Sequence, residues 1–186
     1  MKKIAVIFPG IGYHIDKPLL YYSKKIALEK GYDIVEIQYG KMPTGIKTDK
    51  AKRSEAIGRV ISFIEEQLAK IDFKGYDEVV FVSKSIGSVG AMNYSKSHHI
   101  RARQIIYTPI EETLENMKYL DSECILFHGT NDDWCVTRSV RESSLFLDNE
   151  CIHIIEGVNH SLECGDTLKN LEILVDVMKK TSEFLR

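Results

Sequence analysis

Short apolar runs, most of them closed by glycine, proline or other turn residues, alternate along this chain with longer segments of helical periodicity. The runs expected to form strands are 4–8, 33–39, 78–82, 104–107, 124–127 and 152–155. Continuous apolar runs of this length are typical of parallel strands that are buried on both faces. Strands that alternate with helices pair in parallel through right-handed crossovers, which predicts a three-layer α/β sandwich around a mainly parallel six-stranded sheet.

The helices are expected where apolar residues recur at helical spacing. These segments are residues 19–27, 57–71, a small-residue stretch from about 86, residues 111–118 and 137–147, and a final helix with Leu168, Leu171, Leu174, Val175 and Met178 on one face. Residues 40–50 are expected to form a loop. No repeat or low-complexity linker interrupts this alternation, and 186 residues suit one domain spanning 1–186.

Composition and charge narrow the classes of function. The chain is 44% hydrophobic and 28% charged, which is ordinary for a folded globular protein and excludes a mostly disordered one. Its formal net charge of −2 provides no overall field to attract nucleic acid or an anionic membrane. We therefore expect a small-molecule substrate, with no nucleic-acid and no membrane partner.

The cysteine pattern and the N-terminal residues indicate a cytoplasmic protein. Two lysines precede Ile4–Phe8, but that run is far too short for a signal-peptide core and reads as a strand. The four cysteines, Cys124, Cys135, Cys151 and Cys164, form no C-x-x-C pair and are interpreted as reduced thiols. Cys151-x-His153 and His160-x-x-x-Cys164 lack a further ligand pair at zinc-like spacing, so neither a metal nor another cofactor is expected.

Clusters of turn residues follow five of the six expected strands. They are Pro9–Gly12, Ser83–Gly87, Thr108-Pro109, Gly129–Asp133 and Gly157–His160. In a parallel sheet these clusters converge on the edge formed by the carboxyl ends of the strands, where ligands bind. The functional site is expected at that edge.

Ser83-Lys84-Ser85-Ile86-Gly87 lies between an apolar strand and a helix. A serine at a sharp strand-to-helix turn holds its Oγ above the sheet, and small residues two positions before and after it allow the turn to pack. Gly87 meets this requirement, whereas Ser83 stands where glycine is usual. Lys84 is interpreted as a solvated side chain beside the nucleophile.

A serine nucleophile needs a base, and the base needs a carboxylate that fixes its tautomer. His160 follows the sixth strand and is the expected base. Asp132 follows the fifth strand and is the favoured carboxylate, with the adjacent Asp133 as the alternative. Taken singly, Ser85 suits a helix N-cap, His160 a surface position and Asp132 a turn. Together, on three converging strand ends, they predict a catalytic triad.

The chain order Ser85, Asp132, His160 resembles the α/β-hydrolase superfamily, as do Gly129-Thr130-x-Asp132 and Gly157-x-Asn159-His160-Ser161. The resemblance spans nearly the whole chain. It implies a minimal fold without the family's first two strands, with strand order 2-1-3-4-5-6. The short connection between the fourth and fifth strands implies an open site without a lid.

The resemblance also implies an oxyanion hole of two backbone N–H groups. The first donor is Ile86; the second lies in the loop after the first strand and is Ile11 or, alternatively, Gly12. Pro9 takes the place of the histidine that often precedes the glycine. The residues proposed to line the pocket are Tyr13, His14, Tyr107 and Trp134.

The function expected from these residues is cleavage of a small carboxylic ester or thioester through an acyl-enzyme. The alternatives are an amide or peptide hydrolase with the same triad and a non-catalytic ligand- or partner-binding protein.

Gly10-x-Gly12 also suggests a nucleotide-binding loop. However, Ile15 stands where the third glycine of that motif belongs, and no acidic residue follows the second strand.

Overall fold

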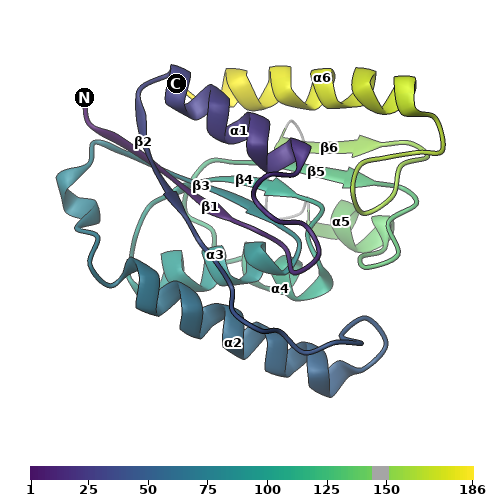
Figure 1. Ribbon diagram of the computed structural model, residues 1–186, viewed down its shortest axis with the longest axis horizontal. Coiled ribbons are helices and arrows are strands. Elements are labelled where there is room, and N and C mark those ends of the chain that lie inside the picture. The colour runs from purple at the N-terminus through teal and green to yellow at the C-terminus, as the bar shows by residue number, and fades with distance from the viewer. Residues whose placement is uncertain (144–150) are drawn as a thin grey trace.

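The computed structural model describes residues 1–143 and 151–186 and contains one sheet of six parallel strands in the order 2-1-3-4-5-6 (Figure 1). The strands are β1 (Lys3–Phe8), β2 (Tyr32–Glu36), β3 (Glu78–Lys84), β4 (Arg103–Tyr107), β5 (Cys124–Gly129) and β6 (Ile152–Ile155). The expected fold class and strand order are confirmed. Chain order reverses between β1 and β3, which pair over the full length of β1.

Helices cover both faces of the sheet, so the molecule has three layers (Figure 1). They are α1 (Pro18–Glu29), α2 (Lys50–Leu68), α3 (Ile86–Ser97), α4 (Glu111–Met117), α5 (Thr137–Ser143) and α6 (Thr167–Phe184), with a 3₁₀ turn at Phe73–Gly75. Helices α1 and α6 pack side by side on one face, whereas α2, α3, α4 and α5 lie on the other.

Alternate side chains of the central strands point to opposite faces of the sheet, so each face has its own apolar core. On β3, Val80 and Val82 join the core beneath α1 and α6, whereas Phe81 packs into the core that α2 and α3 cover. Because every second side chain points to the same face, the last residue of β3, Lys84, also points toward the α1 and α6 side. All three of those residues, Val80, Val82 and Lys84, are 0% exposed.

Several element boundaries differ from the expected ones. Strand β2 ends at Glu36, and residues 37–49 form an irregular connection before α2 begins at Lys50. The helix expected over 137–147 is α5 within the described residues, and residues 144–147 lie outside them. The C-terminal helix turns Met178 into the core but leaves Leu168, Leu171 and Val175 exposed, because the core contact runs along a neighbouring stripe that includes Val177.

The carboxyl ends of all six parallel strands face the same side of the molecule, toward the right in Figure 1. The turns after β1, β3, β5 and β6 therefore come together there, although up to 150 residues of sequence separate them.

Candidate active site

Ser85 occupies the sharp turn between β3 and α3. Its backbone has φ 54° and ψ −129°, in the positive-φ region that residues with a Cβ rarely adopt. Such strain persists only where the surroundings hold it, and here the Ser85 N–H donates to the Tyr107 carbonyl of β4 at 3.1 Å. Two residues earlier, the buried Ser83 hydroxyl donates to the Ile105 carbonyl at 3.2 Å, which explains how serine replaces glycine there.

Gly87 allows the start of α3 to pack directly against the end of β1. A Cβ at this position would lie 2.4 Å from the Pro9 carbonyl oxygen and 2.6 Å from that of Phe8. Only glycine therefore permits this approach, which places the N-terminus of α3 beside the loop that begins at Pro9.

Ser85, His160 and Asp132 form one hydrogen-bonded chain. His160 Nε2 lies 2.8 Å from Ser85 Oγ, and His160 Nδ1 lies 2.8 Å from Asp132 Oδ2 and 2.9 Å from Oδ1. The Asp132 carboxylate is fully buried and also accepts the Trp134 N–H at 2.9 Å. The neighbouring Asp133 instead points outward, with a side chain that is 63% exposed and paired with Lys47. The carboxylate that meets the imidazole is thus that of Asp132.

Backbone contacts between the loops after β5 and β6 fix the Asp132–His160 geometry. Gly129 makes this possible, because a Cβ there would lie 2.2 Å from the Val158 carbonyl oxygen. That same carbonyl accepts the Asn131 N–H at 2.9 Å, and the Asn159 side chain accepts the Ser161 N–H at 2.7 Å. The Asn131–Val158 contact therefore joins the two loops, and the Asn159 side chain stabilises the turn that carries His160.

The environment of His160 favours a neutral imidazole. Burial lowers the pKa of His160 below the ordinary histidine value, and the hydrogen bond to Asp132 opposes that effect. The Trp134 ring stacks on the imidazole with centroids 5.5 Å apart and planes at 29°. A neutral ring that accepts from a hydroxyl at Nε2 and donates to a carboxylate at Nδ1 has the arrangement of a general base.

Backbone N–H groups surround the serine on its other side. Ile86 is the first residue of α3, where N–H groups have no partner within the helix. After β1, Gly10 and Tyr13 exchange backbone hydrogen bonds of 3.1 and 3.3 Å, which leaves Ile11 and Gly12 at the tip of a tight turn. A Cβ on Gly10 would lie 3.3 Å from the Ser85 Cβ, so this turn passes directly over the serine.

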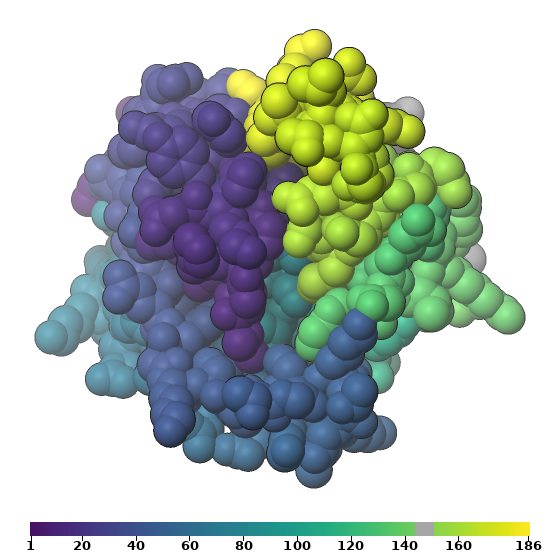
Figure 2. Space-filling view, turned by 45° about the vertical axis from the view of Figure 1, so that its right-hand side comes forward, coloured from purple at the N-terminus to yellow at the C-terminus, as the bar shows by residue number. Residues whose placement is uncertain are grey.

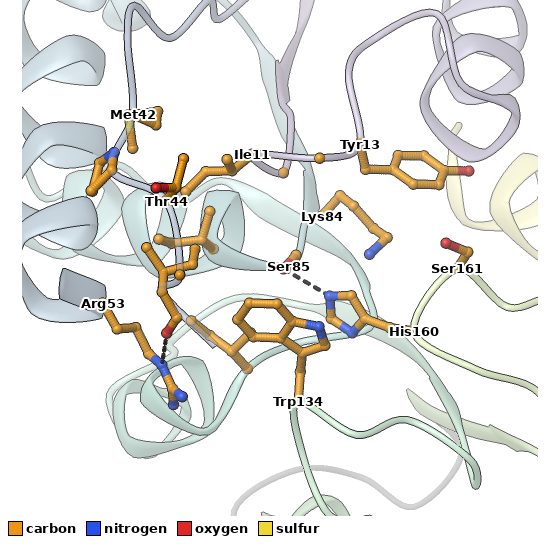
Figure 3. A pocket seen from close by; sticks show the side chains of 17 residues that line it. Ile11, Tyr13, Met42, Thr44, Arg53, Lys84, Ser85, Trp134, His160 and Ser161 are labelled. Carbon is orange, nitrogen blue, oxygen red and sulfur yellow. Dashed lines mark hydrogen bonds between the residues drawn. The ribbon is translucent and has the colours of Figure 1, made fainter. Parts of the chain in front are cut away.

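A cavity of about 500 Å³ opens above Ser85 (Figure 3). Its lining includes Ile11, Tyr13, Met42, Ile46, Arg53, Lys84, Ile86, Ile110, Trp134, His160 and Ser161. In Figure 2 it is the hollow framed by the purple N-terminal loop, the blue loop of residues 37–49, and the green and yellow-green loops after β5 and β6. Its size and mainly apolar walls suit a small organic ligand.

Two residues expected in the pocket lie elsewhere. Tyr107 is fully buried under α1 and α6, where its hydroxyl bonds Ser23 at 2.8 Å and Thr181 at 2.6 Å. Its register on β4 points it away from the cavity. The His14 side chain is 66% exposed and borders a neighbouring hollow beside Tyr39 rather than the cavity above Ser85. Tyr13 and Trp134 do line that cavity.

The expectation that Lys84 is solvated is wrong. The residue is 0% exposed, and its Nζ has no hydrogen-bond partner within the described residues. Its nearest aromatic neighbour is Tyr13, whose ring centroid lies 5.0 Å from Nζ. Burial lowers the pKa of Lys84 from 10.5 to about 7.

The loop between β2 and α2 supplies a wall of the cavity that sequence reasoning missed. Residues 42–46 line it, and Arg53 of α2 holds the loop by donating to the carbonyls of Ile46 at 3.0 Å and Lys47 at 2.6 Å. The Lys47–Asp133 ion pair then joins this loop to the one after β5. Only the Gly40, Pro43 and Gly45 turn signals marked the segment, and they carry no information about where it folds.

The described residues contain no group of three His, Cys, Asp or Glu side chains that could hold a metal ion. In the same part of the chain, no helix is both long and apolar enough to cross a bilayer.

Several solved structures, serine hydrolases among them, share this architecture. Est1E of Butyrivibrio proteoclasticus, in a structure with ferulic acid bound, is similar with a TM-score of 0.70 at 14% identity, over 98% of this chain and 88% of its own. An α/β serine hydrolase homologue from Coxiella burnetii gives 0.62 at 12% identity, over 100% and 85%. A serine hydrolase without a lid from Xanthomonas campestris gives 0.61 at 12%, over 98% and 80%.

These similarities define the class of structure: the chain has the α/β-hydrolase fold. No sequence-family model matches it, and no curated protein is similar to it in sequence, so the likeness is carried by the fold.

Proposed function

We propose that this protein is a serine hydrolase that cleaves a small carboxylic ester or thioester through an acyl-enzyme on Ser85. The observation that carries the proposal is the continuous hydrogen-bonded chain from Ser85 Oγ through His160 to the buried Asp132 carboxylate. The fold, which is shared with a serine hydrolase without a lid and with an esterase from Pyrococcus furiosus, supports hydrolysis as the class of reaction.

In the proposed mechanism His160 Nε2 removes the Ser85 proton as Oγ attacks the substrate carbonyl carbon. The imidazolium that forms is stabilised by Asp132 and gives its proton to the departing oxygen or sulfur as the scissile bond breaks. Water then attacks the acyl-enzyme with His160 again as base, which releases the acid and restores the serine.

The negative charge on the carbonyl oxygen requires hydrogen-bond donors in place before the reaction. Ile86 N–H at the positive end of α3 is the proposed first donor. Ile11 N–H is the proposed second, with Gly12 as the alternative on the same turn. The close packing at Gly87 supports this assignment, because it sets the two backbone segments side by side.

The cavity supports a small substrate. Its volume of about 500 Å³ lies within the range for small-molecule sites, and isoleucine and methionine side chains line the end away from His160. We propose that this apolar end holds a short acyl chain.

Active-site labelling tests the proposal. A fluorophosphonate probe should add once to the wild type, as read by intact mass, and should not add to Ser85→Ala. Ser62→Ala removes an exposed hydroxyl on α2 and should label as the wild type does. Absence of labelling in the wild type would contradict the proposal and favour a non-catalytic binding protein. Acyl esters compared with aryl amides then distinguish an esterase from an amidase.

A further inference from the structure

Lys84 is the one lysine that lines the cavity above Ser85 within the described residues. It is the residue directly before the nucleophile, and the pleat of β3 turns its side chain toward the α1 and α6 side of the sheet. In Figure 3 its Nζ points into the space between Tyr13, His160 and Ser161. These residues make one end of the cavity polar, whereas Ile11 and Met42 lie toward the other end.

The ammonium group is buried without an acceptor. Lys84 carries three N–H donors, is 0% exposed, and makes no hydrogen bond in the described structure. The Tyr13 hydroxyl cannot easily turn to accept a hydrogen bond from Lys84. It is held in place because it already accepts the Leu19 N–H at the start of α1, at 3.1 Å. A buried cation without a hydrogen-bond acceptor is costly, and a carboxylate that accepts its hydrogen bonds offsets part of that cost.

We propose that Lys84 is a specificity-determining residue that binds a carboxylate on the leaving group of the substrate. This inference rests on the proposed hydrolase function and narrows it to esters or thioesters whose alcohol or thiol part is anionic. Lys84 Nζ has no hydrogen bond to break, so it can turn into the cavity when the carboxylate enters.

The geometry favours the leaving group over the acyl group. His160 must protonate the departing atom, so the leaving group lies on the His160 side of Ser85, which is also the side of Lys84. The other cation at the cavity, Arg53, is committed to two loop carbonyls and lies 3.6 Å from Glu112. Among the described residues that line the cavity, Lys84 is the one cation without a hydrogen bond, and one such cation in a largely apolar wall suits a singly charged carboxylate better than a phosphate dianion.

The preference for an anionic leaving group should depend on pH. The charged or titratable groups around Lys84 are Tyr13 and Lys17 before α1, Asp132 after β5 and His160 after β6. Because burial lowers the pKa of Lys84 to about 7, carboxylate binding above that pH requires uptake of a proton. The preference is therefore expected to be largest below about pH 7 and to weaken above it.

The test compares 3-carboxyphenyl butyrate with 3-carbamoylphenyl butyrate, which differ by a carboxylate and a neutral amide of similar shape. The ratio of their kcat/KM values cancels the titration of His160, which acts on both. Lys84→Met should reduce this ratio by about 10- to 100-fold, the value of a charge-assisted hydrogen bond. Lys17→Met is the matched control and should keep the wild-type ratio, since Lys17 also places its ammonium over the Tyr13 ring, at 5.2 Å, but does not line the cavity.

An unchanged ratio in Lys84→Met, or an equal loss for both esters, would overturn the proposal. Fluorophosphonate labelling of each variant separates this failure from failure of the hydrolase function: a site that labels but does not discriminate refutes only the role of Lys84.

Binding of the leaving-group product, 3-hydroxybenzoate, gives a second test that needs no turnover. Calorimetry at pH 8 should show that 3-hydroxybenzoate binds the wild type more tightly than 3-hydroxybenzamide does, with uptake of up to one proton revealed by buffers of different ionisation enthalpy. Equal binding of the two compounds would refute the assignment. Tighter binding of the acid without proton uptake would support the role of Lys84 and show that its ammonium is already charged in the free protein.

Discussion

Substitution of Gly87 by alanine tests whether the docking of α3 on β1 builds the site. The added Cβ would lie 2.4 Å from the Pro9 carbonyl oxygen, about 1 Å short of the 3.4 Å at which ordinary contact begins. The atom that the new Cβ would contact belongs to the backbone. Removing the clash therefore requires α3 or the loop after β1 to move by about 1 Å. The backbone of Gly87 is helical and its φ is not positive, so alanine itself is conformationally acceptable there and the whole effect is steric.

A displacement of this size separates the two proposed oxyanion donors. Misplacement by about 1 Å costs on the order of 10²-fold in rate, and loss of one donor about 10²–10³-fold. Gly87→Ala should therefore lower the second-order rate of fluorophosphonate labelling by at least about 100-fold. Overpacking should also lower the free energy of unfolding by about 1–3 kcal/mol.

Gly58→Ala provides the matched control in a helix. Gly58 is exposed in α2 with nothing within 4 Å of an added Cβ, so alanine should stabilise the protein by about 0.5–1 kcal/mol and leave labelling unchanged. If Gly87→Ala unfolds at the wild-type temperature and labels at the wild-type rate, the argument from close packing is refuted.

Three further predictions concern charged groups. Asp132→Asn should lower kcat on a neutral ester by about 10⁴-fold, because the carboxylate no longer holds the imidazole in the correct tautomer. Asp133→Asn, at an exposed carboxylate, should change kcat little, and the opposite order of effects would make Asp133 the triad acid. The kcat/KM for a neutral ester should rise with pH as His160 loses its proton, and the midpoint of the rise should lie below the ordinary histidine pKa, because burial lowers the pKa of His160. A rise that continues through pH 8 would point to another base. Lys84→Met should raise the melting temperature at pH 7, and the gain should shrink toward pH 10 in scanning calorimetry. The folded pKa of Lys84, about 7, lies below its unfolded value, so wild-type stability rises across that window, and a gain independent of pH would contradict the buried cation.

The positions of the strand ends and the meeting of Ser85, Asp132 and His160 could be anticipated because strand and turn patterns are local in sequence, whereas the order of the strands in the sheet follows only from the resemblance to the α/β-hydrolase superfamily. Apolar runs and turn residues mark where parallel strands end, and parallel topology then brings those ends together. The sequence favours Asp132 but leaves Asp133 as an alternative, because the choice depends on the path of one tight turn after β5.

Burial of individual polar side chains was harder to anticipate. Because lysine is usually solvated, the sequence favours an exposed Lys84. Lys84 nevertheless has the same side-chain phase as Val80 and Val82 on a strand that helices cover on both faces. That alternation was the available signal. The same phase rule places Tyr107 of β4 beneath α1 and α6, away from the cavity.

The wall formed by residues 42–46 had no comparable signal. A loop without periodicity reveals where its chain turns but not which surface it crosses, and its position here depends on contacts made by Arg53 and Lys47.

The sequence contains a single tryptophan, and the structure stacks that residue, Trp134, on the imidazole of His160. All indole fluorescence of the protein therefore originates beside the reacting groups. A protonated imidazole quenches a neighbouring indole more strongly than a neutral one, so emission should follow the charge of His160 directly. Trp134 is therefore an intrinsic fluorescent probe of this site, and stopped-flow fluorescence can time ligand binding and the proposed acylation of Ser85 without any added dye.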